Sequence, residues 1–246
     1  MKFTVAPQVF EKLPGVCFGA VAAYGMNNRA EYPVIAARLD EAIAAAAARF
    51  EGKKVKDDPA ILPYRTAFQS LGVNPNKFMS SIEAMFTRVA KGKGLPHINP
   101  IVDLGNALSL KYVLPMGAHD IVQAEGHDIE VRFSTAADTF IPFGETEAET
   151  MPAGELIYTV GPRVRTRHWI WRQSELGKIG PDSCDIFFPI DGFAPFNKDA
   201  ILAARDELAE LCRTVFGCAD VRTGFVDSEH PSFDLSKNFL RQKRIT

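Results

Sequence analysis

The sequence contains few cysteines, and they follow no recognisable pattern. None lies in a C-x-x-C pair or at the spacing of zinc ligands: Cys17, Cys184, Cys212 and Cys218. This argues against the common zinc modules and indicates free thiols in a reducing compartment. An excess of charge is also lacking, because 28 Lys and Arg residues face 30 Asp and Glu residues, for a net charge of -2. Such a balance argues against a surface coated in basic charge for non-specific nucleic-acid binding, but it leaves room for a local basic face.

Long hydrophobic runs are lacking too. The N-terminus has no charged segment followed by an apolar core, so no signal peptide is predicted. The longest apolar run, which is rich in alanine and lies near residue 45, is interrupted by charges and is too weak to span a bilayer. We therefore expect a cytoplasmic protein without a membrane partner. Its 246 residues, 46% of them hydrophobic, suffice for one large domain or two small ones.

The order of the predicted elements indicates the fold class. Helices come first, strands dominate the middle, and one helix follows, which indicates an α+β fold with a mixed, β-rich core and flanking helices. We expect a strand-helix region over residues 1–60 that packs on a main domain over 61–235, followed by a loosely ordered basic tail over 236–246. The predicted helices are 33–50, 64–71, 81–93, 100–112 and 198–215, and the predicted strands are 15–23, 129–134, 139–143, 156–160, 164–171, 185–190 and 221–226.

Four polar side chains are predicted to meet around the end of a central helix. Asn99 suits the cap of this helix and Pro100 suits its first turn. Pro115 and Gly117 end the helix and turn the chain towards the next strand. Helical spacing places two polar residues on one face, and two more follow just past the helix end. We therefore expect one cavity lined by Asp103, Asn106, His119 and Asp120.

Arginine and tryptophan alternate along the stretch 163–172. One face of the predicted strand presents Arg163, Arg165, Arg167, Trp169 and Trp171. Arginines beside tryptophans suit a single-stranded nucleic acid or an aromatic ligand, through charge and stacking together. The alternative is a buried tryptophan pair beside a solvated arginine row that keeps an edge strand from aggregating. Alternation alone does not decide between the two.

Two His-Asp pairs raise the question of a metal site. His119-Asp120 and His127-Asp128 lie eight residues apart, but neither pair sits at i,i+4 on a helix, and H-E-x-x-H is absent. Asp128 is more typical of a turn before a strand. A serine triad is not legible either, because no G-x-S-x-G occurs. We predict neither a metal nor a cofactor.

Several short motifs follow one another along the chain. The central ones are Asn99-Pro100-x-Val102-Asp103-x-x-Asn106, Pro115-Met116-x-Ala118-x-Asp120 and Val131-Arg132. The flanking ones are Tyr64-Arg65-x-x-Phe68-x-x-Leu71-Gly72-Val73, Gly154-Glu155-Leu156-Ile157 and Trp169-x-Trp171-Arg172. In this order the motifs resemble the B3/B4 domain of the bacterial phenylalanyl-tRNA synthetase beta subunit, and the free-standing proteins built on that domain. The resemblance implies a mixed, β-rich core flanked by helices.

The resemblance also implies a site. In the synthetase domain, an amino-acid pocket hydrolyses mischarged tRNA with a glutamate that aligns with Glu175. The corresponding turn of the family reads Pro-Met-His-Ala-Phe-Asp, and here Gly117 replaces its histidine and His119 replaces its phenylalanine. The implied catalytic residues are Glu175, His119 and Asp120. The implied substrate-binding residues are Asn106, Asp103, Met116, Trp169, Trp171 and Arg172.

Three functions remain open at this point. The first is a stand-alone tRNA-binding protein, with or without hydrolysis of mischarged aminoacyl-tRNA in trans, in which Arg163, Arg165 and Arg167 meet RNA. A hydrolytic site is useful because an apolar pocket rejects an isostere with one extra hydroxyl only by roughly 10²-fold. The second is a non-catalytic pocket protein that binds a free aromatic amino acid or a related metabolite. The third is a structural or interaction domain, and a complete ligase is not expected in a chain this short.

Overall fold

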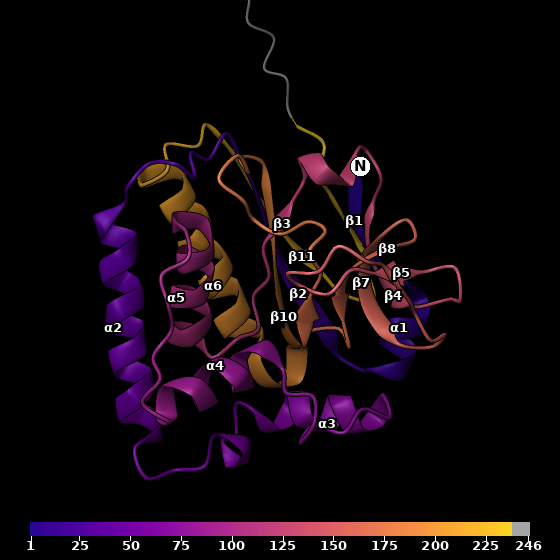
Figure 1. Ribbon diagram of the computed structural model, residues 1–246, viewed down its shortest axis with the longest axis horizontal. Coiled ribbons are helices and arrows are strands. Elements are labelled where there is room, and N and C mark those ends of the chain that lie inside the picture. Colours follow the sequence, from indigo (N-terminus) through magenta and orange to yellow (C-terminus); the bar gives the residue numbers. More distant parts are fainter. Residues whose placement is uncertain (238–246) are drawn as a thin grey trace, which may run out of the picture.

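The buried strand β2 (Val16–Tyr24) organises the smaller of two sheets. In the computed structural model, which describes residues 1–237, β2 pairs antiparallel with β10 (Ile186–Phe193) and with β11 (Asp220–Val226). The short strand β3 (His119–Asp120) extends this sheet beyond β10. Figure 1 shows β2, β10 and β11 together in the centre of the molecule.

The second sheet is larger than the first. Its strands within residues 1–237 are β1 (Lys2–Val5), β4 (Ile129–Phe133), β5 (Thr139–Phe140), β6 (Glu149–Thr150), β7 (Leu156–Val160), β8 (Arg163–Arg167), β9 (Arg172–Gln173) and β12 (Ser232–Asp234). They run in the order β12-β1-β4-β7-β8-β5-β6, with β9 paired to β8. The pairs β1-β4 and β5-β8 are parallel, and the others are antiparallel.

Helices cover one face of the smaller sheet. Helix α6 (Ala194–Thr214) packs on β2 and β10, α5 (Pro100–Tyr112) packs on α6, and α2 (Pro33–Phe50) packs on α5. Figure 1 shows these three helices to one side of the sheet, with α4 (Ser81–Ala90) and α3 (Leu62–Ser70) along the lower edge. Helix α1 (Pro7–Lys12) contacts β4, and η1 (Val55–Asp57) and η2 (Val122–Ala124) are short 3-10 helices.

The two faces of β2 belong to different parts of the core. Cys17, Val21 and Ala23 pack with residues of α5 and α6 in one hydrophobic cluster. Phe18 and Ala20, on the opposite face, pack with residues of β1, β4 and β7 in another. A strand covered on both faces needs no polar alternation. This explains why the run is apolar at every position, since burial contributes about 25 cal/mol per Å² on each side.

The α+β class predicted from the sequence is confirmed. The predicted helices 33–50 and 100–112 coincide with α2 and α5. As predicted, Asn99 caps α5 by accepting a hydrogen bond from the Val102 N–H at 3.0 Å. Ser80 caps α4 in the same way, by accepting from the Glu83 N–H at 3.4 Å.

Some predicted boundaries are wrong. The predicted strand 164–171 ends at Arg167, because His168 and Trp169 adopt left-handed φ angles of 43° and 61° and turn the chain back into β9. The predicted strand 185–190 continues to Phe193. The predicted helix 198–215 starts earlier than expected: α6 begins at Ala194 and kinks at Asn197. The predicted basic tail lies outside the described residues, apart from positions 236 and 237.

Candidate functional site

A cavity of about 150 Å³ lies between the turn that follows α5 and the hairpin of β8 and β9. The turn contributes the whole segment Pro115–His119 to its wall. Strands β7, β8 and β10 contribute Tyr158, Thr166 and Asp191. The hairpin and the start of α4 close the other side with Trp169, Ile170, Trp171, Gln173 and Ser81.

Strand β10 holds the turn in place. The Gly117 N–H donates to the Pro189 carbonyl at 3.0 Å, and the Asp191 N–H donates to the Pro115 carbonyl at 3.0 Å. His119 then lies opposite Phe187 in the β3-β10 pair. These bonds fix the turn, and with it Met116 and His119, on the cavity wall; both belong to the site predicted from the sequence.

His119 is buried and neutral. Its side chain is 4% exposed, and its ring stacks on Tyr158 with 5.3 Å between centroids and 21° between planes. Burial, reinforced by the nearby charge of Arg165, lowers the pKa of His119 from 6.5 to about 3. Its Nδ1 has no hydrogen-bond partner within residues 1–237. At pH 7 the ring therefore brings one N–H and one lone pair, but no charge.

Asp191 is a buried carboxyl group in the same wall, and the sequence reasoning missed it. Its Oδ1 accepts hydrogen bonds from the Tyr158 hydroxyl at 2.6 Å and from Trp169 Nε1 at 2.7 Å. Burial raises the pKa of Asp191 from 3.8 to about 7, against the lowering effect of those two bonds. A carboxyl group that titrates near neutral pH suits general acid–base chemistry. The available signal was a single acidic residue inside the apolar stretch Ile186–Phe193.

Trp169 reaches Asp191 because the backbone turns sharply at the end of β8. Left-handed φ angles at His168 and Trp169 are uncommon for non-glycine residues, and they persist only where surrounding contacts hold them. Glu155 supplies such contacts, since it accepts from the His168 N–H at 2.8 Å and from Arg167 at 2.8 and 3.0 Å. The Trp169 side chain is thereby fully buried in the cavity wall.

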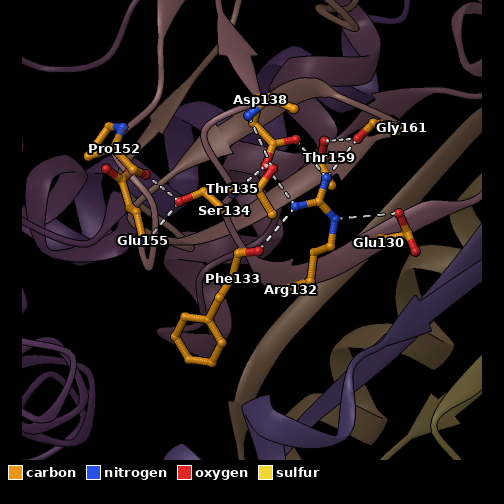
Figure 2. Close-up of polar contacts among 11 residues, drawn as sticks. Glu130, Arg132, Phe133, Ser134, Thr135, Asp138, Pro152, Glu155, Thr159 and Gly161 are labelled. Carbon is orange, nitrogen blue, oxygen red and sulfur yellow. Dashed lines mark hydrogen bonds and ion pairs between the residues drawn. The ribbon is translucent and has the colours of Figure 1, made fainter.

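Glu155 is itself held by the loop that follows β4. Figure 2 shows Ser134 between the Pro152 carbonyl, to which it donates at 2.6 Å, and the Glu155 N–H, from which it accepts at 2.9 Å. Arg132 anchors the same loop by donating to both oxygens of the buried Asp138 carboxylate, at 2.7 and 2.9 Å (Figure 2). A buried pair of this kind is costly to break. The loop therefore braces the turn that places Trp169.

The arginines of β8 are engaged by other residues of the protein. Arg163 pairs with Glu125 at 3.1 Å, and Arg167 forms the ion pair described above. Arg165 is 2% exposed and donates Nη2 to the Gln123 carbonyl at 2.6 Å. Burial lowers the pKa of Arg165 to about 10. The three side chains therefore form no free basic row, and their predicted contact with RNA stays a prediction.

Four residues were predicted to meet in one cavity, and only His119 lines the cavity described here. Asp120 instead caps η2, accepting from the Val122 N–H at 2.9 Å and from the Ser183 hydroxyl at 2.6 Å. Asp103 lies at the start of α5, where it accepts from the Ile98 N–H at 2.9 Å. Asn106 is half-buried on the same helix and is not among the residues that line the cavity.

Glu175 also lies outside the cavity. It forms an ion pair with Lys178 and accepts a hydrogen bond from the Gly144 N–H at 2.9 Å. Two hydrogen bonds lower the pKa of Glu175: the larger effect comes from Lys178 and the smaller one from the Gly144 N–H. Arg172 is exposed, with its guanidinium 6.0 Å from the centre of the Trp171 ring. The roles predicted for Glu175 and Arg172 stay predictions.

The two His-Asp pairs do not combine. Asp120 caps η2, whereas Asp128 accepts a hydrogen bond from the Lys2 N–H at 2.7 Å. Within residues 1–237, no three His, Cys, Asp or Glu side chains are grouped so as to hold a metal ion. In the same part of the chain, no helix combines the length and the apolar character that crossing a membrane requires.

Comparison with known families identifies the domain that contains this cavity. A family model described as the B3/4 domain matches residues 63–216, which is more than half of the chain. The chain belongs to the B3/4 domain family. The matched part of this B3/4 domain includes every residue that lines the cavity, from Ser81 to Asp191.

Among solved structures, this B3/4 domain is similar to the crystal structure of an N-terminal fragment of the phenylalanyl-tRNA synthetase beta-subunit from Pyrococcus horikoshii. The two share 9% sequence identity with a TM-score of 0.40, over 91% of this chain and 49% of the other. This chain therefore spans about half the length of that fragment. No curated protein matches the chain.

The exchange at Gly117 and His119 has a steric reason. A Cβ atom at position 117 would lie 3.3 Å from His119 Nε2 and 3.3 Å from Pro189 Cγ, which is tighter than ordinary van der Waals contact. Glycine at 117 leaves room for the imidazole two positions later.

Proposed function

We propose that this B3/4 domain binds the aminoacyl end of a tRNA in the cavity around His119 and Asp191, and hydrolyses the ester that joins the amino acid to the tRNA. The observation that carries the proposal is the Asp191 carboxyl group, which is buried in the cavity wall with a pKa raised to about 7. Membership of the B3/4 family supports a role associated with aminoacyl-tRNA synthetases.

Asp191 is the general base in this proposal. Its Oδ1 is occupied by the bonds from Tyr158 and Trp169, which leaves Oδ2 for a water molecule. The ionised carboxylate takes a proton from the water as the water oxygen bonds to the ester carbonyl carbon. The bond from that carbon to the tRNA oxygen then breaks, and the proton passes to the tRNA oxygen. The products are a free amino acid and a tRNA with a free hydroxyl group.

The walls of the cavity favour a small amino acid with a polar group. Its volume of about 150 Å³ is below the roughly 300–1,000 Å³ of typical ligand pockets. Met116 and Trp169 supply apolar walls, whereas Thr166 and Gln173 supply hydrogen-bonding groups. A site that hydrogen-bonds a substrate hydroxyl discriminates far more strongly than an apolar pocket does.

A second function uses the same cavity without catalysis, as a binding site for a free aromatic amino acid or a related metabolite. The observation that favours it is that Arg163, Arg165 and Arg167 each contact other residues of the protein. These contacts take away the basic row that the sequence offered to RNA. The stacked rings of His119 and Tyr158 provide one aromatic side of such a binding site.

Hydrolysis of a panel of mischarged aminoacyl-tRNAs separates the two functions. The wild type should hydrolyse at least one ester, and Asp191→Asn should slow that reaction by about 10²-fold or more, the usual contribution of a general base. The control Asp182→Asn changes an aspartate whose side chain is 85% exposed, and it should leave the rate unchanged. If no ester is hydrolysed and a free amino acid binds in calorimetry, the second function replaces the first.

A further inference from the structure

Four lysines of this B3/4 domain gather around one pocket that runs along α4, the helix whose first residue lines the cavity. The pocket has a volume of about 360 Å³ and is referred to here as the lysine pocket. Three of the lysines come from the loop between α2 and η1 and from η1, and the fourth follows α4: Lys53, Lys54, Lys56 and Lys91. All four are exposed, and Figure 1 shows the loop at the lower edge of the molecule.

Lys56 acts electrostatically on Glu83, but no close ion pair neutralises these lysines in the described part of the chain: the lysine ion pairs there involve other positions. Glu83 is the acidic residue among those that line the lysine pocket, and it is paired with Arg65. Asp58, just beyond the loop, is paired with Arg49 at 3.0 Å. The lysine pocket therefore concentrates positive charge on a chain whose net charge is -2.

The lysine pocket is built on anchored elements. Val55, between the lysines, is 6% exposed and belongs to the hydrophobic core. Across the floor, Arg65 donates to the Pro75 carbonyl at 3.2 Å and to Asn76 Oδ1 at 2.6 Å. Oε2 of the buried Glu83 accepts no hydrogen bond from the described part of the chain. This acceptor suits a hydroxyl donor such as a ribose 2′-OH, and not a phosphate.

Helix α4 connects the lysine pocket to the cavity. Its first residue, Ser81, lines the cavity, whereas Glu83, Thr87 and Ala90 line the lysine pocket, which reaches Lys91 just past the end of the helix. At a rise of about 1.5 Å per residue, the helix spans roughly 14 Å between Ser81 and Ala90. One strand of a stacked duplex carries one phosphate per about 3.4 Å of helix axis, so this span corresponds to about four stacked nucleotides.

We infer that the lysine pocket binds the phosphodiester backbone of an RNA strand whose aminoacylated end occupies the cavity. The inference rests on the proposed function and adds the RNA contact that β8 does not supply. Lysines that neutralise phosphates release counterions, which stabilises the complex most at low salt. Contacts to phosphates position a nucleic acid without reading its sequence. Different tRNAs therefore bind alike at the lysine pocket, and the cavity alone selects the amino acid.

The test compares two triple variants of the full chain. The first is Lys53→Gln, Lys54→Gln and Lys56→Gln. The control, Lys2→Gln, Lys12→Gln and Lys198→Gln, removes the same charge from exposed lysines outside the lysine pocket. Fluorescence anisotropy measures the affinity for tRNA between about 50 and 200 mM salt, the range over which phosphate contacts weaken strongly. The same proteins are assayed with an aminoacyl-adenosine ester, which is too short to span from the cavity to the lysine pocket.

In the first variant, affinity for tRNA should depend less steeply on salt. The negative slope of log affinity against log salt should shrink in magnitude by about 2 to 3, at roughly 0.7 to 0.9 for each lost contact. The control should change that slope by less than about 1, and both variants should hydrolyse the short ester like the wild type. Equal slopes in the two variants would contradict RNA binding at the lysine pocket and would leave the proposed function intact. The same holds for a wild type that hydrolyses the short ester but binds no tRNA. A wild type that neither binds tRNA nor hydrolyses the short ester would overturn both.

Discussion

Replacing Asp191 by asparagine tests the site through stability as well as through activity. The amide has the shape of the carboxyl group, and its oxygen still accepts from the Tyr158 hydroxyl and from Trp169 Nε1. Burial raises the pKa of Asp191 from 3.8 to about 7. Between these two values the folded wild type holds a proton that the unfolded chain has released. Its free energy of unfolding therefore falls as the pH rises through this window, and the variant lacks this dependence.

The expected magnitude follows from the two pKa values. They differ by about 3 pH units, and one unit corresponds to about 1.36 kcal/mol. Relative to Asp191→Asn, the wild type should therefore lose about 4 kcal/mol of unfolding free energy between pH 4 and pH 7. Above pH 7 the difference should level off, because Asp191 is then ionised in both states. The titration of His119 cancels, since both proteins contain that residue.

Urea unfolding of both proteins at intervals from about pH 4 to pH 8 measures this difference. The hydrolysis rate of the wild type should rise with pH through about 7, as Asp191 ionises, whereas the residual rate of the variant should not. Parallel stability curves would refute the reasoning. They would mean that Asp191 titrates as an ordinary carboxyl group, and its assignment as a base near neutral pH would lose its physical basis.

Three further substitutions test other parts of the site. Glu175→Ala removes a surface ion pair with Lys178, so melting temperature and hydrolysis should not change; lost hydrolysis with an intact fold would instead support the catalytic role predicted from the sequence. His119→Phe should reduce acid sensitivity in unfolding titrations. The lowered pKa of His119, about 3, means that its contribution to stability is complete above pH 6.5 and is lost as the pH falls towards 3. Gly177→Ala should lower the urea-unfolding free energy by about 2 kcal/mol or more, because φ is 78° there and the added Cβ would press on the buried Arg165; an unchanged value would contradict that packing.

Patterns that depend on neighbouring residues were predictable from the sequence. Asn99 and Pro100 marked the start of α5, and the unbroken apolar run marked β2, because caps and burial on both faces act locally. The same holds for the turn after α5, which Pro115 and Gly117 indicated.

The features that were missed depend on contacts between distant parts of the chain. Asp191 owes its raised pKa to burial, and its partners Tyr158 and Trp169 lie 33 and 22 residues away. The left-handed turn at His168 and Trp169 contains no glycine that would mark it in the sequence. It is held instead by a hydrogen bond to Glu155, which precedes it by more than ten residues. The predicted alternation along β8 is interrupted at Arg165, where the register with β7 shifts and where Val164 and Arg165 are both buried. The exposure of Arg163 and Arg165 depends on contacts with Glu125 and Gln123, and that of Arg167 depends on its pair with Glu155. No local pattern encodes these contacts.

The bond from Trp169 to Asp191 also makes the cavity visible by optical spectroscopy. The chain contains 2 tryptophans. The indole of Trp169 is fully buried and donates to the carboxylate, whereas Trp171 is partly exposed and packs edge-on against Phe78 at 4.8 Å. The fluorescence emission of Trp169 is thus coupled to the charge on Asp191 and to any ligand that displaces solvent from the cavity. Occupancy of the cavity is therefore open to measurement in the unlabelled protein, with Trp171→Phe isolating the informative signal.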